Sequence, residues 1–129
     1  MTHILLVDDD ASILQAYDLL LGLAGHTVVT ATDGAHALCV LAGRLNVHDL
    51  GTDLLITDLR MPRLNGLGLI REIRQSPVPA IRDIPAILMT GEFSAETQRA
   101  GIIAGADLVL PKPCEEDLLL TAINRLLGP

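Results

Sequence analysis

The sequence contains few aromatic residues and few basic ones. Tryptophan is missing, tyrosine and phenylalanine occur once each, and aromatic residues make up 2% of the chain. A buried core must therefore consist of leucine, isoleucine, valine and alanine. The 9 Lys and Arg residues are outnumbered by 16 Asp and Glu residues, which gives a formal net charge of −7. Because an acidic chain repels phosphates, we expect no direct binding to nucleic acid.

Cysteine and long apolar runs are scarce as well. The two cysteines, Cys39 and Cys114, have no metal-ligand spacing, which predicts a reducing compartment and no disulfide framework. No apolar run approaches the ~20 residues of a membrane-spanning helix. The stretch 1–6 is too short for a signal peptide and is followed almost directly by acidic residues. We expect a cytoplasmic protein that does not bind a membrane.

Apolar residues, by contrast, make up 50% of the 129 residues. This length and this composition fit one domain, 1–129, with a single core. Short apolar or β-branched runs alternate with segments whose apolar residues recur at helical spacing. The predicted strands are 3–7, 27–31, 53–58, 84–90 and 107–111, and the predicted helices lie within 11–25, 33–45, 65–75, 94–106 and 114–128. The stretch 76–83 is predicted to be an exposed loop.

This alternation predicts an α/β fold with a doubly wound, five-stranded parallel sheet and helices on both faces. In such a sheet, ligands bind beyond the carboxyl ends of the strands. The polar residues at those ends are Asp8, Asp9, Asp10, Asp58, Thr90 and Lys112. The fold would bring them to one edge of the sheet, where clustered carboxylate oxygens are ligands that suit Mg²⁺.

Four motifs in this order resemble the receiver domain of bacterial two-component response regulators. They are "VDDD" at 7–10, "DLRMP" followed by "NG" at 58–66, "MTG" at 89–91 and "GADLVLPKP" at 105–113. The resemblance covers essentially the whole chain. It implies a flavodoxin-like (βα)5 fold with strand order 2-1-3-4-5 and a phosphorelay function.

The resemblance assigns the metal site to the acids that end the first and third strands. Asp9 is similar to the direct ligand of Mg²⁺, and Asp8 to the acid that binds the ion through water. Asp58 and the backbone carbonyl of Arg60 would complete the protein ligands. Mn²⁺ could take the place of Mg²⁺. Crowded carboxylates disfavour one another's ionisation, so such a site should bind cations or protons readily.

The resemblance also assigns the residues that handle the phosphoryl group. Asp58 is similar to the aspartate that accepts it from a histidine kinase or a histidine phosphotransfer protein. Thr90 matches the hydroxyl that closes on the phosphate, and Lys112 matches the lysine that pairs with a phosphate oxygen. The face formed by the fourth predicted helix, the fifth strand and the fifth helix would then repack and engage an output partner. This describes a signalling switch that catalyses its own modification, not an enzyme with a separate substrate.

Two other classes of function stay open at this point. "DDDAS" at 8–12 also fits a phosphatase of the haloacid dehalogenase type, with Asp8 as nucleophile and Asp10 as acid. The chain is short for that fold, and Asp58 would have no role. The second class is an inert flavodoxin-like interaction module. A purely structural role, in which the acids cap a helix, needs only one of them, and Asp10 is the predicted cap.

Two positions depart from the pattern of the family. Val109 stands where most receivers have Tyr or Phe, so the aromatic rotamer that usually follows the movement of Thr90 is missing. Cys114 stands where Phe is common, and we expect no role for its thiol. Cys39 is predicted to lie in the core, on an apolar helix face. The histidines, His3, His26, His36 and His48, are predicted to be ordinary surface or loop residues.

Three local predictions can be compared directly with the structure. The peptide bond between Lys112 and Pro113 should be cis, because the chain must turn back toward Asp58 and the similar family uses cis here. Pro111 cannot donate to a strand ladder, so its strand should lie at an edge of the sheet. Arg60 and Glu92 follow adjacent strand ends, and one hypothesis is that they meet above the phosphoryl group and hinder an attacking water. The alternative is two solvated charges that do not interact.

Overall fold

The computed structural model describes residues 2–44 and 51–128. The strands are β1 (His3–Val7), β2 (Thr27–Ala31), β3 (Leu54–Asp58), β4 (Ala86–Thr90) and β5 (Leu108–Pro111). The helices are α1 (Ala11–Leu23), α2 (Gly34–Arg44), α3 (Gly66–Arg74), α4 (Pro79–Arg82), α5 (Ala95–Ala104) and α6 (Glu116–Leu127). Each predicted strand is present, and its bounds differ from the prediction by at most two residues.

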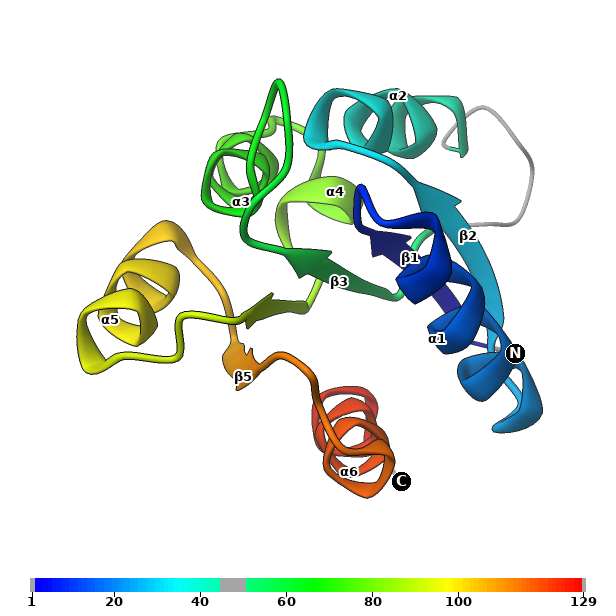
Figure 1. The fold of residues 1–129 in the computed structure, drawn as a ribbon. Coiled ribbons are helices and arrows are strands. Elements are labelled where there is room, and N and C mark those ends of the chain that lie inside the picture. The colour runs from blue at the N-terminus through cyan, green and yellow to red at the C-terminus, as the bar shows by residue number, and fades with distance from the viewer. Residues whose placement is uncertain (1, 45–50, 129) are drawn as a thin grey trace.

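The sheet is parallel throughout and has the order β2-β1-β3-β4-β5 (Figure 1). This confirms the predicted flavodoxin-like order. Both neighbours of β1 are in register with it, since Leu5 pairs with Val29 of β2 and with Leu55 of β3. As the order requires, β5 is an edge strand. Strands β1, β3 and β4 therefore end side by side, and their carboxyl ends share one edge of the sheet.

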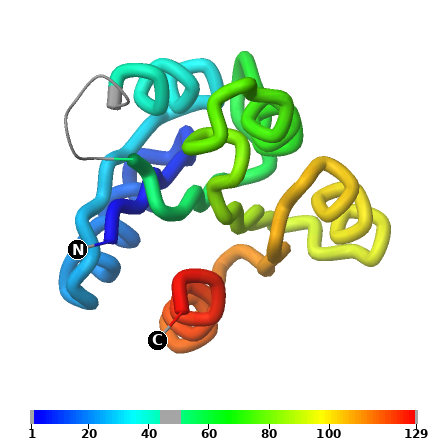
Figure 2. Tube along the Cα trace, turned by 180° about the vertical axis from the view of Figure 1, so that it is seen from behind, coloured from blue at the N-terminus to red at the C-terminus, as the bar shows by residue number. Residues whose placement is uncertain are grey.

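The sheet separates two aliphatic cores. Leu5 and Val7 point to the face covered by α2, α3 and α5, whereas Ile4 and Leu6 point to the face covered by α1 and α6. Alternate residues of a strand face opposite sides, so a strand in the middle of the sheet must be apolar at nearly every position. Figures 1 and 2 place α5 and α6 on either side of β5.

Helix ends follow the expected capping chemistry. Asp10 caps α1, and its side chain accepts hydrogen bonds from the backbone amides of Ser12 at 2.9 Å and Ile13 at 3.3 Å. The predicted cap is confirmed. Ser94 caps α5 in the same way, since its side chain accepts from the backbone amide of Thr97 at 3.1 Å. Gly105 ends α5 in the left-handed conformation with φ 117°, which glycine adopts without a steric penalty.

Two predictions about local structure are wrong. The stretch 76–83 contains α4, because Pro79 starts a helical turn and Arg74 donates to the carbonyl of Arg82 at 2.8 Å, near its end. Cys39 is exposed. It lies two residues from Ala37 and two from Leu41, which face the core, and two residues turn a helix by about 200°.

The remaining local predictions have mixed outcomes. The bond between Lys112 and Pro113 is cis, as expected. His36 is exposed, but His3 belongs to β1 and is half-buried, as is His26. His48 lies outside the described residues. Among residues 2–44 and 51–128, no helix is long and apolar enough to cross a membrane.

Candidate functional site

Three carboxylates meet at the carboxyl edge of the sheet. Asp8 and Asp9 follow β1, and Asp58 ends the adjacent strand β3. One oxygen from each lies within 4.8 Å of the others. Asp8 is buried, Asp58 is half-buried and Asp9 is exposed. The third acid of the run, Asp10, is occupied as the cap of α1.

Lys112 supplies a cation to this cluster. Its Nζ lies 2.7 Å from Oδ2 of Asp8 and 3.1 Å from Oδ2 of Asp58. The side chain reaches these acids from β5, and the Lys112 amide donates to the carbonyl of Thr90 at 2.9 Å at the base of the turn. The structure therefore brings together Asp8, Asp9, Asp58 and Lys112, all of which the sequence placed at strand ends.

The environment changes the affinity of this cluster for protons. Burial raises the pKa of Asp58, the hydrogen bond from Lys112 lowers it, and the nearby charge of Asp8 raises it further; the pKa lies above its ordinary value. Burial lowers the pKa of Lys112, but its bonds to Asp8 and Asp58 outweigh burial and raise the pKa overall. Lys112 therefore stays protonated, but its single positive charge does not balance the negative charge of the three carboxylates.

The donor set fits a hard divalent cation. Three carboxylates face one ammonium group, so negative charge remains in excess. Mg²⁺ prefers oxygen ligands and keeps several waters, and the exposed side of Asp9 leaves room for them. Arg60 lies in the turn directly after β3, two residues beyond Asp58. Its carbonyl as a metal ligand stays a prediction.

Thr90 ends β4, the strand beside β3, and is buried. Its hydroxyl oxygen accepts a hydrogen bond from the backbone amide of Glu92 at 2.9 Å. A hydroxyl that accepts in this way can still donate its own hydrogen. The position at the end of the strand agrees with the predicted role of Thr90, whereas its movement toward a phosphate stays a prediction.

Arg60 and Glu92 are in contact, as the hypothesis of a pair requires. Nε of Arg60 donates to Oε1 of Glu92 at 2.6 Å, and Nη2 of Arg60 contacts the same oxygen. The side chains are 74% and 55% exposed, so the pair contributes only about 0–1 kcal/mol to stability. It joins the loop after β3 to the loop after β4. The residues also line a hollow of about 390 Å³ between α3 and α5.

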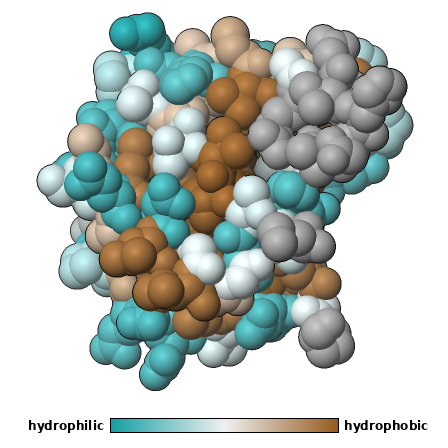
Figure 3. Space-filling model, turned by 90° about the vertical axis from the view of Figure 1, so that its right-hand side faces the viewer, coloured by the Kyte–Doolittle hydropathy of each residue, from teal (hydrophilic) through white to brown (hydrophobic). Residues whose placement is uncertain are grey.

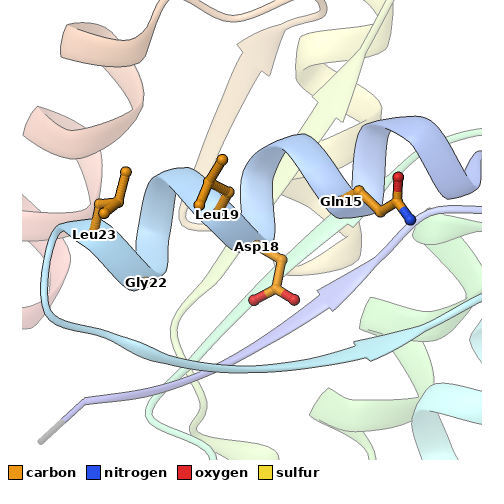
Figure 4. Close-up of a pocket in the computed structure, with 5 residues that line it drawn as sticks. All are labelled: Gln15, Asp18, Leu19, Gly22 and Leu23. Carbon is orange, nitrogen blue, oxygen red and sulfur yellow. The ribbon is translucent and has the colours of Figure 1, made fainter.

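Other features lie away from the strand ends. A hollow of about 410 Å³ on α1 is lined by Gln15, Asp18, Leu19, Gly22 and Leu23 (Figure 4). Figure 3 shows hydrophobic residues interspersed with hydrophilic ones on the molecule's right-hand side as drawn in Figure 1.

Cys114 is buried. Burial and, second, the charge of Glu115 raise the pKa of its thiol, so the thiol is less readily ionised than an exposed one.

Sequence reasoning missed an ion pair beside the site. Arg63, in the loop after β3, lies with Nε 3.5 Å from Oδ2 of Asp33. The other carboxylate oxygen of Asp33, Oδ1, accepts from the amide of His36 at 2.8 Å, at the start of α2. A contact between two loops depends on their placement in the fold, so neither residue type alone could indicate it.

Comparison with protein families identifies the arrangement. The sequence profile of the response regulator receiver domain family matches residues 4–124. The transcriptional regulatory protein CpxR of Klebsiella pneumoniae is 35% identical over 127 residues, which cover 98% of this chain and 50% of that protein. The response regulator MprA of Mycobacterium ulcerans is 36% identical over 125 residues, covering 97% and 50%. The chain thus spans about half the length of these relatives.

Solved structures show the same similarity. A putative response regulator from Chloroflexus aurantiacus has a TM-score of 0.88 and 30% identity, with 99% of this chain and 98% of that chain covered. The chemotaxis protein CheY4 of Vibrio cholerae has a TM-score of 0.87 and 31% identity, covering 98% and 99%. The receiver domain of the sensor histidine kinase PA1611 from Pseudomonas aeruginosa, with magnesium in its active-site cleft, has a TM-score of 0.85 and 26% identity, covering 99% and 98%.

Proposed function

Because the chain belongs to the response regulator receiver domain family, we propose that Asp58 accepts a phosphoryl group from the phosphohistidine of a histidine kinase or a histidine phosphotransfer protein. The observation that carries this proposal is the position of the Lys112 ammonium, in contact with both Asp58 and Asp8. A cation held beside a half-buried carboxylate is the arrangement needed where an anionic group is transferred to that carboxylate.

The transfer joins an oxygen of Asp58 to phosphorus and breaks the phosphorus–nitrogen bond of the phosphohistidine, whose imidazole leaves and takes a proton. The difficulty is electrostatic, because an anion approaches a carboxylate. Lys112 offsets the charge on the transferring group from its position 3.1 Å from Asp58. Asp9, Asp58, the Arg60 carbonyl and, through water, Asp8 would hold Mg²⁺, which would supply further positive charge beside the transferring group. Positioning and charge compensation account for most of the catalysis in such a reaction.

The product is an acyl phosphate, which water hydrolyses, so the modified state has a limited lifetime. The chain would thus catalyse its own phosphorylation and dephosphorylation and act as a switch. Thr90 donates its hydroxyl hydrogen to the phosphoryl group and draws the loop after β4 inward. Because Glu92 is bonded through its amide to Thr90, the Arg60–Glu92 pair shifts with that loop.

Movement of the loop after β4 would be passed to α5, β5 and α6, the face that the sequence analysis assigned to an output partner. No aromatic side chain at position 109 can rotate to follow Thr90. Val109 instead lies against α5 where a Cβ on Gly101 would be 2.8 Å from Cγ2 of Val109. Such close packing passes a shift of β5 directly to the backbone of α5.

A phosphatase that uses Asp8 as nucleophile and Asp10 as acid is not favoured. The Asp10 side chain accepts from two backbone amides of α1, and Asp8 accepts from the Asp10 amide at 2.9 Å and pairs with Lys112. A cytoplasmic location, the single-domain range 1–129 and the lack of direct contact with nucleic acid or a membrane stay predictions from the sequence.

The proposal is tested with acetyl phosphate or a phosphorylated histidine kinase as donor, with Mg²⁺ or with excess EDTA. Phosphate-affinity electrophoresis measures the modified fraction. We expect modification only with the metal, and none in Asp9→Asn. Asp10→Asn is the matched control, because it removes a neighbouring charge while asparagine still caps a helix. Wild-type modification of Asp9→Asn, or equal modification in EDTA, would refute the metal assignment.

A further inference from the structure

The loop after β3, residues 60–65, lies against the start of α2. The amide of Gly34 donates to the carbonyl of Leu64 at 3.0 Å. A Cβ at position 34 would clash with the backbone and side chain of Leu64, so only glycine allows this approach. At its base the loop is closed by a bond of 2.9 Å from the amide of Gly66 to the carbonyl of Leu59. The loop that carries Arg60 is therefore held from two sides.

An ion pair adds a third attachment. Nε of Arg63 lies 3.5 Å from Oδ2 of Asp33, whose side chain is only 5% exposed. The two oxygens of this carboxylate are used differently, since Oδ1 caps α2 and Oδ2 faces the guanidinium. A buried carboxylate is costly without a charged partner. Arg63, although 76% exposed itself, supplies that partner from the loop.

Arg63 has a backbone conformation that a long side chain seldom adopts. Its φ is 66°, and it is the one non-glycine residue with positive φ among residues 2–44 and 51–128. Glycine, asparagine or aspartate adopt this conformation more readily than a long side chain does. The guanidinium, however, reaches Asp33 from there, which a short side chain could not do.

We propose that Arg63 and Asp33 are positioning residues for the metal site. Their ion pair holds the loop on α2 and thereby orders the Arg60 carbonyl before the metal arrives. Because the loop is already ordered in the folded protein, less conformational entropy is lost when the cation binds, and the affinity for the cation is higher. This inference rests on the proposed function, because it assumes that the cation binds at Asp8, Asp9 and Asp58.

A positioning role and a simple charge effect predict opposite changes in cation affinity for Arg63→Gln. If only long-range charge matters, Arg63→Gln removes a positive charge and strengthens cation binding, whereas Asp33→Asn weakens it. If the pair positions the loop, both substitutions weaken binding, and the double variant binds no more weakly than either single variant. Asn at position 33 still caps α2, so Asp33→Asn isolates the pair from the cap.

Calorimetric titration with MgCl₂ measures the effect on the full chain. We expect Arg63→Gln and Asp33→Asn each to raise the Kd for Mg²⁺ two- to fivefold, the range of a partly exposed ion pair. Arg63→Lys should retain the wild-type Kd within about twofold, since it keeps the charge. The matched control is Arg71→Gln, which removes an equal charge from an exposed position on α3 and should not raise the Kd.

Hydrogen exchange of the metal-free protein gives a second readout that needs no metal. The amides of residues 61–66 should exchange severalfold faster in Arg63→Gln than in the wild type. An unchanged or lower Kd together with unchanged exchange would overturn the positioning role while leaving the proposed function intact. A wild-type chain that binds no Mg²⁺ would overturn both.

Discussion

The two edges of the sheet use charged residues in opposite ways. At the amino edge, Arg74 of α3 donates to the carbonyls of Gly105 at 3.0 Å, Arg82 at 2.8 Å and Ile84 at 2.6 Å, and to Oδ2 of Asp107 at 3.1 Å. Asp107 also accepts from the amide of Ala86, at the start of β4. At the carboxyl edge, Lys112 is shared between Asp8 and Asp58, and Asp9 lies within reach of both acids.

The difference lies in the balance of charge. Arg74 faces one carboxylate and several neutral carbonyls, so negative charge is not in excess around its guanidinium, and its hydrogen bonds link α3 to the end of α4, the end of α5 and the loop before β4. The carboxyl edge brings three carboxylates together with one ammonium group, which contacts two of them, so negative charge is in excess there. Burial, together with the charge of Asp8, holds the pKa of Asp58 above its usual range. A charged side chain whose partners balance its charge indicates a structural contact. A cluster with an excess of negative charge indicates a binding site.

Removal of Lys112, the cation in contact with Asp8 and Asp58, should have the largest effect. In Lys112→Met, phosphorylation by acetyl phosphate with saturating Mg²⁺ should slow about 100-fold or more, since a lost charge-stabilising donor typically costs this much. The Kd for Mg²⁺ should fall at the same time, because Asp8 and Asp58 lose their competing cation. A rate within a few-fold of the wild type would remove Lys112 from the mechanism.

The amino edge should respond in stability and not in chemistry. Arg74→Met removes four hydrogen bonds from a charged donor, two of them partly buried, and should lower the free energy of unfolding by about 2–3 kcal/mol. Urea denaturation measures this, and phosphorylation of the folded variant should proceed at the wild-type rate. Arg71→Met, on an exposed position of the same helix, serves as the control and should change stability by less than about 0.5 kcal/mol. Impaired phosphorylation in folded Arg74→Met would contradict the separation of the two edges.

The excess charge should be visible in the stability of the metal-free protein. The pKa of Asp58 is raised in the folded state, so its ionised form is less favourable there than in the unfolded chain. Stability therefore falls as pH rises through the folded pKa. In EDTA at pH 7, Asp58→Asn should be more stable than the wild type by urea denaturation. The advantage should shrink as pH is lowered toward the ordinary carboxylate range, and a less stable variant would contradict the prediction.

The smallest effect is expected from the exposed pair above the site. If Arg60 and Glu92 together hinder the attacking water, Arg60→Ala and Glu92→Ala should each speed dephosphorylation by up to about fivefold. The double variant should be no faster than either single one. Loss of the acyl phosphate over time, after removal of the donor, gives the three rates. Simple additivity of the single effects would show that the residues are not coupled.

The two edges of the sheet also differ in how far the sequence predicts their contacts. Alternating apolar runs determine the strands, and parallel strands bring their carboxyl ends together, so Asp8, Asp58 and Lys112 could be grouped before their distances were known. The contacts of Arg74 and the pair of Arg63 with Asp33 could not, because they join loops and helix ends far apart in sequence. Helix α4 was missed because a single turn of four residues is too short to show a helical apolar period.

Exposure of Cys39 illustrates a different limit. Cys39 was assigned to the core because it is an apolar residue among other apolar residues of α2, and its angular position on the helix was not weighed. The angle from Ala37 and Leu41 resolves this once the buried side is known.

The central claim is that Asp58, and not another acid of the cluster, carries the phosphoryl group. The direct measurement is to modify the protein with acetyl phosphate and Mg²⁺, reduce the acyl phosphate with borohydride, and locate the reduced residue by mass spectrometry of peptides. We predict that the reduced residue is found at position 58 and that Asp58→Asn yields none. Reduction at Asp8 or Asp9 in the wild-type protein would contradict the account.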